Sequence, residues 1–236
     1  MVKPKVVTFD CAQTLVHVDW KMGQFERDCA LHAGLQLSEE ASILYADLYR
    51  ERHDRYLAVN LTKDHGACKG FWDDLGVDWL RALGYEETWL TRINSAADEL
   101  GFGPHSRIFK IYPDVIPALQ RLKANGVRLA VISNWDYSLH RVLRGAGIYD
   151  EFEVVIASLE EGMEKPDTRL FHMTLEKLGV GPEEAAHVGD DPIDDLKGAR
   201  DAGMRAVLID RARKAPPSPP YISSLNQLPE ALGWTD

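Results

Sequence analysis

The sequence predicts an α/β protein whose parallel sheet is doubly wound and interrupted by an all-helical insertion. From residue 113 onward, short strands that are apolar throughout alternate with helical segments, as in a sheet covered by helices on both faces. Before residue 113, by contrast, a single strand is followed by ~80 residues that are almost wholly helical in pattern. The 236 residues correspond to about one and a half domains, which suits a core that carries an insertion.

The individual elements follow from local signals along the chain. Residues 5–9 are a short β-branched and aromatic run, typical of a buried strand. Ser38 is a suitable N-cap for one helix of the insertion, and two acids follow it in the first turn. Pro113 lies near the start of a later helix, which Asn125 and Gly126 end. Further strands are predicted at 127–133, 154–157, 186–189 and 205–209, helices at 113–126, 138–145, 167–178 and 194–202, and a stiff proline-rich connector at 216–220.

The place of the insertion in the chain predicts where a ligand would bind. An insertion directly after the first strand lies at the carboxyl edge of the sheet, which is where open α/β sheets bind their ligands. We therefore expect residues 1–15 and 113–236 to form a core domain, and residues 16–112 to form a helical cap over a ligand site.

Composition excludes several classes of protein. Lys and Arg number 27 and Asp and Glu 37, and the whole surplus of −10 lies in residues 150–201, which hold 15 acids and 5 bases. An acidic excess argues against a nucleic-acid partner, and no apolar run approaches the ~18 residues of a membrane span. The apolar run near the N-terminus is too short for a signal peptide. The three cysteines have no CxxC spacing and indicate neither disulfides nor zinc, so we expect a cytoplasmic protein.

Polar clusters follow four of the predicted strands. They are Asp10–Thr14, Ser133-Asn134, Lys165-Pro166 and Gly189–Asp195. An isolated Asp at a strand end is most often a turn or helix cap. Because the carboxyl ends of parallel strands meet at one edge of a sheet, however, all four clusters are expected to converge there. Four chemically compatible clusters at one edge therefore indicate a site.

The residue types in these clusters suit phosphoryl transfer. The carboxylates of Asp10 and Asp190 are the hard oxygen ligands that Mg²⁺ takes, few in number and supplemented by water. A metal that neutralises Asp10 and an incoming phosphate allows a carboxylate to attack an anion. Ser133 can donate a hydrogen bond to a phosphoryl oxygen, and Lys165 supplies a fixed positive charge. The sequence therefore predicts a Mg²⁺-dependent hydrolase of a small phosphorylated molecule.

The four clusters, in this order, resemble the motifs of the haloacid dehalogenase-like (HAD) hydrolase superfamily. The matching segments are Phe9–Leu15, Val131–Asn134, Glu164–Asp167 and His187–Arg200. The resemblance covers residues 5–210. It implies a Rossmann-like core and a helical cap of the C1 type.

The resemblance also implies a role for individual residues. Asp10 is the nucleophile that forms an aspartyl-phosphate, and Ser133 and Lys165 act on the phosphoryl group. The expected substrate-binding residues are Thr14, Ser133, Asn134 and Lys165. The expected Mg²⁺ ligands are Asp10, Asp190, Asp195 (directly or through water) and the backbone carbonyl of Ala12.

Position 12 departs from the pattern of the superfamily's phosphatases. Those enzymes carry a second Asp here, which protonates the leaving group and then activates the hydrolytic water. Ala12 cannot transfer a proton, and general acid–base catalysis is worth roughly 10²–10⁴ in rate. We therefore expect slow turnover of alkyl phosphates and a smaller effect on aryl or acyl phosphates. His17, Asp19 or water could replace the acid, although an ordinary flap residue is the simpler interpretation of His17.

Alternative functions stay open at this point. Phosphonoacetaldehyde hydrolases of the same superfamily also carry Ala here and use a cap lysine that forms a Schiff base. The cap lysines of this chain are Lys21, Lys63 and Lys69, for which a solvated loop position is the simpler interpretation. Dehalogenases lack an acid at the position of Asp190, which argues against dehalogenation. A non-catalytic member that binds phosphate ligands or partners is the remaining alternative, and the oligomeric state is undetermined.

Overall fold

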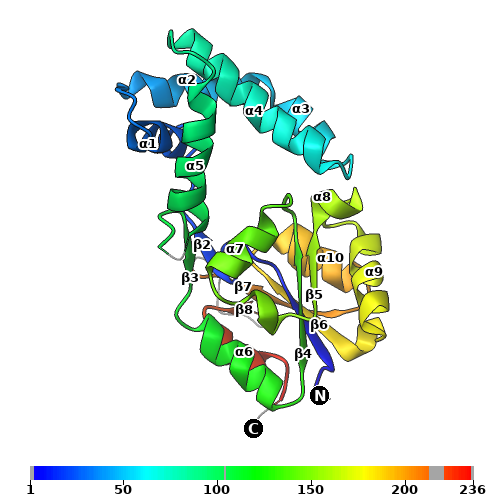
Figure 1. Cartoon of the computed structure of the whole chain (residues 1–236). Helices are drawn as coiled ribbons and strands as arrows, with labels where there is room; N and C mark the ends of the chain where they lie inside the picture. The colour runs from blue at the N-terminus through cyan, green and yellow to red at the C-terminus, as the bar shows by residue number, and fades with distance from the viewer. Residues whose placement is uncertain (1–2, 104, 213–220, 235–236) are drawn as a thin grey trace. The chain divides into compact units, whose positions relative to one another are not determined.

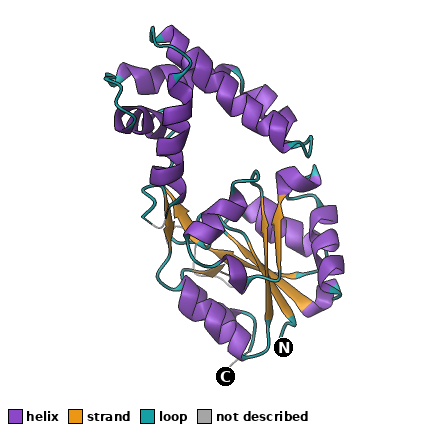
Figure 2. Cartoon of the chain, viewed as in Figure 1, coloured by secondary structure: helices purple, strands orange, loops and turns teal. Residues whose placement is uncertain are grey.

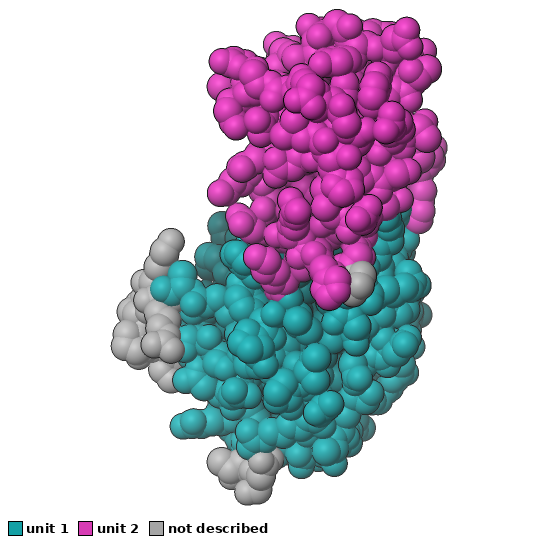
Figure 3. Space-filling view, turned by 60° about the vertical axis from the view of Figure 1, so that its left-hand side comes forward, with its two compact units in different colours: residues 1–17, 111–236 teal, residues 18–110 magenta. Residues whose placement is uncertain are grey.

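The computed structural model describes residues 3–103, 105–212 and 221–234, so the connector predicted at 216–220 lies outside the described residues. The chain divides into two compact units, coloured separately in Figure 3. The core unit comprises residues 1–17 and 111–236, and the helical unit comprises residues 18–110. The chain passes between the units at two short strands, β2 (Val16–Val18) and β3 (Phe109–Ile111), which pair with each other.

The core unit is built on a six-stranded parallel sheet in the order β5-β4-β1-β6-β7-β8 (Figure 1). Strand β1 has β4 on one side and β6 on the other, so the strand order reverses around it. Such a reversal opens a crevice at the carboxyl ends of the central strands, where ligands bind. The strands are β1 (Val6–Phe9), β4 (Arg128–Ser133), β5 (Val154–Ala157), β6 (Ala185–Gly189), β7 (Arg205–Ile209) and β8 (Tyr221–Ile222).

Helices cover both faces of this sheet (Figure 2). On one face, side chains of β1, β4 and β5 form a common hydrophobic core with α9 (Thr168–Leu178) and α10 (Gly198–Asp201). The other face is covered by α6 (Val115–Ala124) and α7 (Leu139–Gly145). Burial on both faces explains why the strands are apolar throughout. The predicted fold class, a doubly wound parallel sheet, is confirmed. The short helices α8 and α11 occupy Ser158–Glu161 and Leu228–Ala231.

The helical unit has a hydrophobic core of its own. Trp79 lies at its centre with 1% of its surface exposed, and its indole Nε1 donates to the carbonyl of Ala41 at 2.8 Å. Tyr45 packs edge-on against the same ring. No helix in the described part of the chain is both long and apolar enough to cross a membrane. The helices are α1 (Gln24–His32), α2 (Glu40–Glu51), α3 (His53–Asn60), α4 (His65–Ala82) and α5 (Trp89–Phe102).

The segment predicted as one helix at 194–202 takes a different form. A π-helical turn occupies Pro192–Lys197, and α10 continues from it. The Asp191 carboxylate begins this turn by accepting hydrogen bonds from the backbone N–H groups of Ile193 and Asp194, both at 2.7 Å. Apolar periodicity does not distinguish a π turn from an α turn, which is why the sequence did not reveal it. Turns of this kind are frequent at functional sites.

A largely buried ion pair connects the C-terminal part of the core unit to the start of α6. Asp114, at the start of α6, accepts hydrogen bonds through Oδ2 from Arg211 Nη1 (2.6 Å), Ser224 Oγ (2.6 Å) and Leu225 N (2.8 Å). Arg211 also donates from Nη2 to the carbonyl of Thr14 at 2.6 Å. Burial raises the pKa of Asp114, but these donors outweigh it and hold the pKa below its usual value.

Removal of this carboxylate should destabilise the protein strongly. Asp114→Ala removes the carboxylate from a largely buried Arg211 guanidinium that keeps its bond to Thr14 O, so we expect the free energy of unfolding to fall by about 2 kcal/mol at pH 7. Because the folded state lowers the pKa, this contribution is present above ~pH 4 and is lost as the pH falls further. Urea denaturation at pH 7 and at ~pH 2.5 measures both effects. The exposed Asp47→Ala is the control, and equal losses in the two variants would contradict the expectation.

Candidate active site

Three of the polar clusters meet at the carboxyl ends of the central strands. Asp10 follows β1, Ser133 ends β4, and Lys165 lies in the loop between α8 and α9. Ser133 Oγ donates to Asp10 Oδ1 at 2.9 Å, and Lys165 Nζ donates to the same oxygen at 2.7 Å. Asp10 Oδ2 has no hydrogen-bond donor within the described residues. One carboxylate oxygen is thus held by two donors while the other stays available.

The Lys165 ammonium is buried between two carboxylates. Its Nζ lies 2.7 Å from Asp10 Oδ1 and 2.5 Å from Asp195 Oδ1, with 2% of the side chain exposed. Burial lowers the pKa of this lysine, but the two negative charges outweigh burial and raise it above its ordinary value. Lys165 is therefore a permanent, immobile positive charge at the site.

Asn134 holds the backbone of the lysine loop. Its Oδ1 accepts from Lys165 N at 2.8 Å, and its Nδ2 donates to Lys165 O at 2.9 Å and to Asp194 Oδ2 at 3.2 Å. The side-chain amide is thus occupied by protein partners. Thr14, also expected to bind substrate, has a fully buried side chain whose hydroxyl lacks a partner in the described part of the chain. The structure brings Asp10, Ser133 and Lys165 together, whereas the exposed Asn134 is bonded to the lysine loop and Thr14 is buried.

Three carboxylates gather beside this lysine. Asp10, Asp190 and Asp195 each offer an oxygen, and these three atoms lie within 4.8 Å of one another. Burial, reinforced by the charges of Asp10 and Asp195, raises the pKa of Asp190 to about 7. Burial also raises the pKa of Asp10, although Lys165 opposes it.

The charge of this group suits a divalent cation. When all three carboxyls are ionised, they and the one ammonium leave two negative charges in a largely buried space. Hard oxygen donors of this number are what Mg²⁺ binds when several of its ligands are waters. The residues present therefore fit the metal that the sequence predicts. Ala12, expected to contribute a backbone carbonyl, lies two residues from Asp10 and forms an isolated bridge with Val16.

Asp195 is fixed from several sides. Its Oδ1 accepts from Lys165 and from His187 Nε2 at 3.0 Å, and its Oδ2 accepts from Asp191 N at 3.0 Å. Gly189 makes room for it, because a Cβ at that position would lie 2.0 Å from Asp195 Cγ. Burial raises the pKa of Asp195, but Lys165 and His187 outweigh it and lower the pKa. Sequence reasoning assigned no role to His187, although a titratable residue in an otherwise apolar strand was a usable signal.

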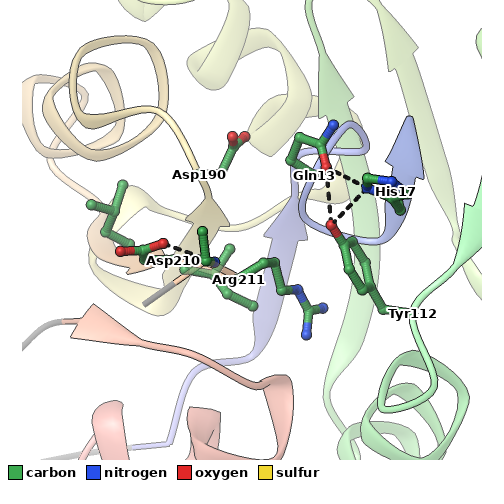
Figure 4. Close-up of a pocket in the computed structure, with 9 residues that line it drawn as sticks. Gln13, His17, Tyr112, Asp190, Asp210 and Arg211 are labelled. Atoms are coloured by element: carbon green, nitrogen blue, oxygen red, sulfur yellow. Dashed lines mark hydrogen bonds between the residues drawn. The ribbon is translucent and has the colours of Figure 1, made fainter. Parts of the chain in front are cut away.

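A pocket of about 640 Å³ borders the acidic group on the core unit (Figure 4). Asp190 lines one part of it, and the hydrogen-bonded side chains of Gln13, His17 and Tyr112 line another. Gln13 Oε1 accepts from the Tyr112 hydroxyl at 2.9 Å and lies 3.1 Å from His17 Nδ1. Arg211 stacks on the ring of Tyr112, its guanidinium carbon 4.1 Å from the ring centre. His17 thus borders the same pocket as a proposed metal ligand, but one ring nitrogen is engaged by its neighbours.

The remaining candidates belong to the helical unit and are exposed there. Lys21 has 70% of its side chain exposed and lies 4.0 Å from Asp19, which is itself 51% exposed. Lys69 is paired with Asp73 one helical turn away, and Lys63 lies in an exposed loop. A lysine that forms a Schiff base needs burial to lower its pKa. None of these three lysines is buried in the structure.

Comparison with known proteins identifies the family. The family model described as haloacid dehalogenase-like hydrolase matches residues 4–203. A glyceraldehyde 3-phosphate phosphatase of Methanopyrus kandleri is 33% identical over 210 residues, covering 89% of this chain and 85% of that protein. A phosphoserine phosphatase of Thermus thermophilus is 37% identical over 162 residues, which are 62% of this chain and 65% of that protein.

A solved structure extends the likeness to the whole chain. The 2-haloacid dehalogenase of Pseudomonas syringae has 26% sequence identity and a TM-score of 0.68, with 99% of both chains covered. The matched family residues include all four polar clusters around Asp10 and Lys165. The chain therefore belongs to the haloacid dehalogenase-like hydrolase family.

Proposed function

We propose that this enzyme is a Mg²⁺-dependent phosphatase of small phosphorylated metabolites that works through an aspartyl-phosphate on Asp10. The observation that carries the proposal is the buried Lys165 ammonium, which lies between Asp10 and Asp195 while Asp190 completes an acidic cluster. The Lys165 ammonium, together with a metal ion held by the carboxylates, would attract and stabilise an anionic substrate. Two relatives that are named phosphatases support the same reaction class.

The metal would be held by side chains that converge on one point. Asp10, Asp190, Asp195 and the carbonyl of Ala12 would hold Mg²⁺, with Asp195 bound directly or through water. When bound, the ion supplies positive charge that offsets the carboxylates and the substrate phosphate. Dehalogenation is disfavoured because the superfamily's dehalogenases lack an acid at the position of Asp190. The exposure of Lys21, Lys63 and Lys69 disfavours the Schiff-base route.

The proposed chemistry assigns one task to each oxygen of Asp10. Oδ1 is held by Ser133 and Lys165, so Oδ2 attacks phosphorus while the bond from phosphorus to the leaving-group oxygen breaks. Lys165 has a third N–H for a phosphoryl oxygen, and Ser133 exchanges its bond to Asp10 for one to the phosphoryl group, so both hold the oxygens on which charge develops. Water then attacks the acyl phosphate, which releases inorganic phosphate and restores the carboxylate. The leaving oxygen gains one proton and the attacking water loses one.

The helical unit is the expected source of substrate selection, and the cysteines indicate the compartment. We expect residues 16–112 to act as the cap that selects the substrate, since the core unit supplies all residues of the proposed chemistry. The three cysteines are free and buried, as is usual in the reducing cytoplasm, where we place the enzyme.

The nucleophile can be tested by removal of its charge. Asp10→Asn should lower Mg²⁺-dependent phosphate release from a panel of monoesters by at least ~10³-fold, because an amide does not attack phosphorus. EDTA should abolish the wild-type rate and added Mg²⁺ should restore it. Asp201→Asn, an exposed change on α10, is the matched control. An Asp10→Asn rate equal to that of the wild type would refute the proposed mechanism.

The substitution at position 12 can be tested by its reversal. Wild-type enzyme should be slower on a sugar phosphate than on an aryl phosphate, because an alkoxide leaves poorly without a proton donor. Ala12→Asp should raise kcat on the sugar phosphate by ~10-fold or more and change the aryl rate little. Ala12→Asn, of the same size but without a transferable proton, should not. Comparable wild-type rates on the two substrates, with chemistry rate-limiting, would contradict this expectation.

His17 can be tested as a substitute acid in the same assay. Its Nδ1 is engaged by Gln13 and Tyr112, and the side chain is exposed, which favours an ordinary flap position. We expect His17→Asn to keep the rate on both substrates within ~2-fold, as for a surface change. A selective loss on the sugar phosphate would instead assign the proton transfer to His17.

A further inference from the structure

His187 is an imidazole buried in the middle of the sheet. It lies on β6 directly beside Thr8 of β1, and none of its surface is exposed. The ring of Phe171 packs edge-on against it, with the ring centres 5.2 Å apart. A polar group buried in this way is costly unless its hydrogen bonds are made. Both ring nitrogens are bonded: Nδ1 to Thr8 Oγ1 at 2.8 Å and Nε2 to Asp195 Oδ1 at 3.0 Å.

The hydrogen-bond partners determine which nitrogen carries the proton. Asp195 Oδ1 is a carboxylate oxygen, which only accepts, so Nε2 at 3.0 Å carries the ring proton. In a neutral ring Nδ1 is then the acceptor, and the Thr8 hydroxyl, 2.8 Å from Nδ1 and 3.4 Å from the carbonyl of Ala186, donates to it. None of the ring surface is exposed, and an apolar, buried environment favours the neutral form of a titratable group. The imidazole is thus a neutral donor aimed at Asp195.

A neutral donor orients Asp195 without cancelling its charge. Asp195 Oδ1 is shared by His187 and Lys165, and Asp191 N holds Oδ2. A charged imidazolium would neutralise the carboxylate and weaken its hold on Lys165. A neutral N–H restricts the rotation of the carboxylate and leaves the full negative charge for the lysine. Lys165 in turn reaches Asp10.

We propose that Thr8 and His187 are positioning residues, which orient Asp195 and through it hold the Lys165 ammonium against Asp10. Neither side chain touches the substrate. The effect on turnover rests on the proposed function, because it acts through Lys165 on the phosphoryl group. The series of hydrogen bonds from Thr8 to Asp10 is independent of the proposed function.

Steady-state kinetics with an aryl phosphate and Mg²⁺ give the first test. Thr8→Val removes the hydroxyl with little change in shape, and we expect kcat to fall ~5- to 10-fold while KM changes less than ~2-fold. His187→Leu should lower kcat further, and His187→Gln, which keeps an N–H, should recover part of the loss. Thr174→Val is the matched control, because Thr174 is equally buried and donates only to the Leu170 carbonyl within α9. Equal effects of Thr8→Val and Thr174→Val on kcat would overturn the proposal.

NMR of protein with ¹⁵N-labelled His and Lys gives a test that needs no turnover. In wild type, His187 should show a protonated Nε2 and an unprotonated Nδ1, and Lys165 a slowly exchanging ammonium signal. Thr8→Val and His187→Leu should shift or broaden the Lys165 signal, whereas Thr174→Val should not. An Nδ1-protonated ring, or a Lys165 signal unchanged in both variants, would overturn the proposal. If no phosphate ester is hydrolysed, the proposed function fails while these spectra still decide the positioning role.

Discussion

The ammonium of Lys165 is the charge on which the rest of the site depends. It is almost completely buried and lies within hydrogen-bond distance of Asp10 and Asp195, two carboxylates that would otherwise repel each other. An unpaired buried charge costs several kcal/mol, so the lysine and the two acids require one another. Further hydrogen bonds orient these three residues. Asn134 bonds the backbone N–H and carbonyl of Lys165, and His187 bonds the carboxylate of Asp195. The site is organised before any substrate arrives, as electrostatic catalysis requires.

The acidic surplus of the chain has a partly local explanation. Residues 150–201 hold the excess of ten negative charges, and four of those acids, Asp190, Asp191, Asp194 and Asp195, lie at or beside the π-helical turn. The Asp191 carboxylate caps the start of the turn, and Asp194 accepts a hydrogen bond from the Asn134 amide. The Asp195 side chain lies against Gly189. The acidic surplus, which argued against a nucleic-acid partner, is thus partly explained by the carboxylates of one site. The two negative charges left unbalanced there are what makes a divalent cation a fitting ligand.

Ala12 is the position at which this chain lacks the proton donor that the superfamily's phosphatases carry. Every other polar residue of the clusters is present, and the described structure gathers the proposed nucleophile, cation and acids as a phosphatase would need them. Loss of one proton donor affects the step in which the leaving group departs, and its importance depends on how basic that group is. The consequence is a proposed preference among substrates, with no loss of phosphoryl transfer as such.

The fold class, the order of the elements and the four converging clusters could be predicted from the sequence. Apolar strands and polar residues at strand ends are local patterns, and a parallel sheet brings those strand ends to one edge. It did not reveal β2, β3 and β8, which are too short to show a period, or the π-helical turn, whose periodicity resembles that of an α-helix. Nor did it separate residues that face the site from those that support it. Asn134 and Thr14 match the motifs as well as Ser133 does, yet the Asn134 amide bonds the Lys165 backbone and the Thr14 side chain is buried. His187 gains its role only from Thr8 and Asp195. These points became visible only in the folded chain, because the direction of a side chain depends on neighbours far away in the sequence.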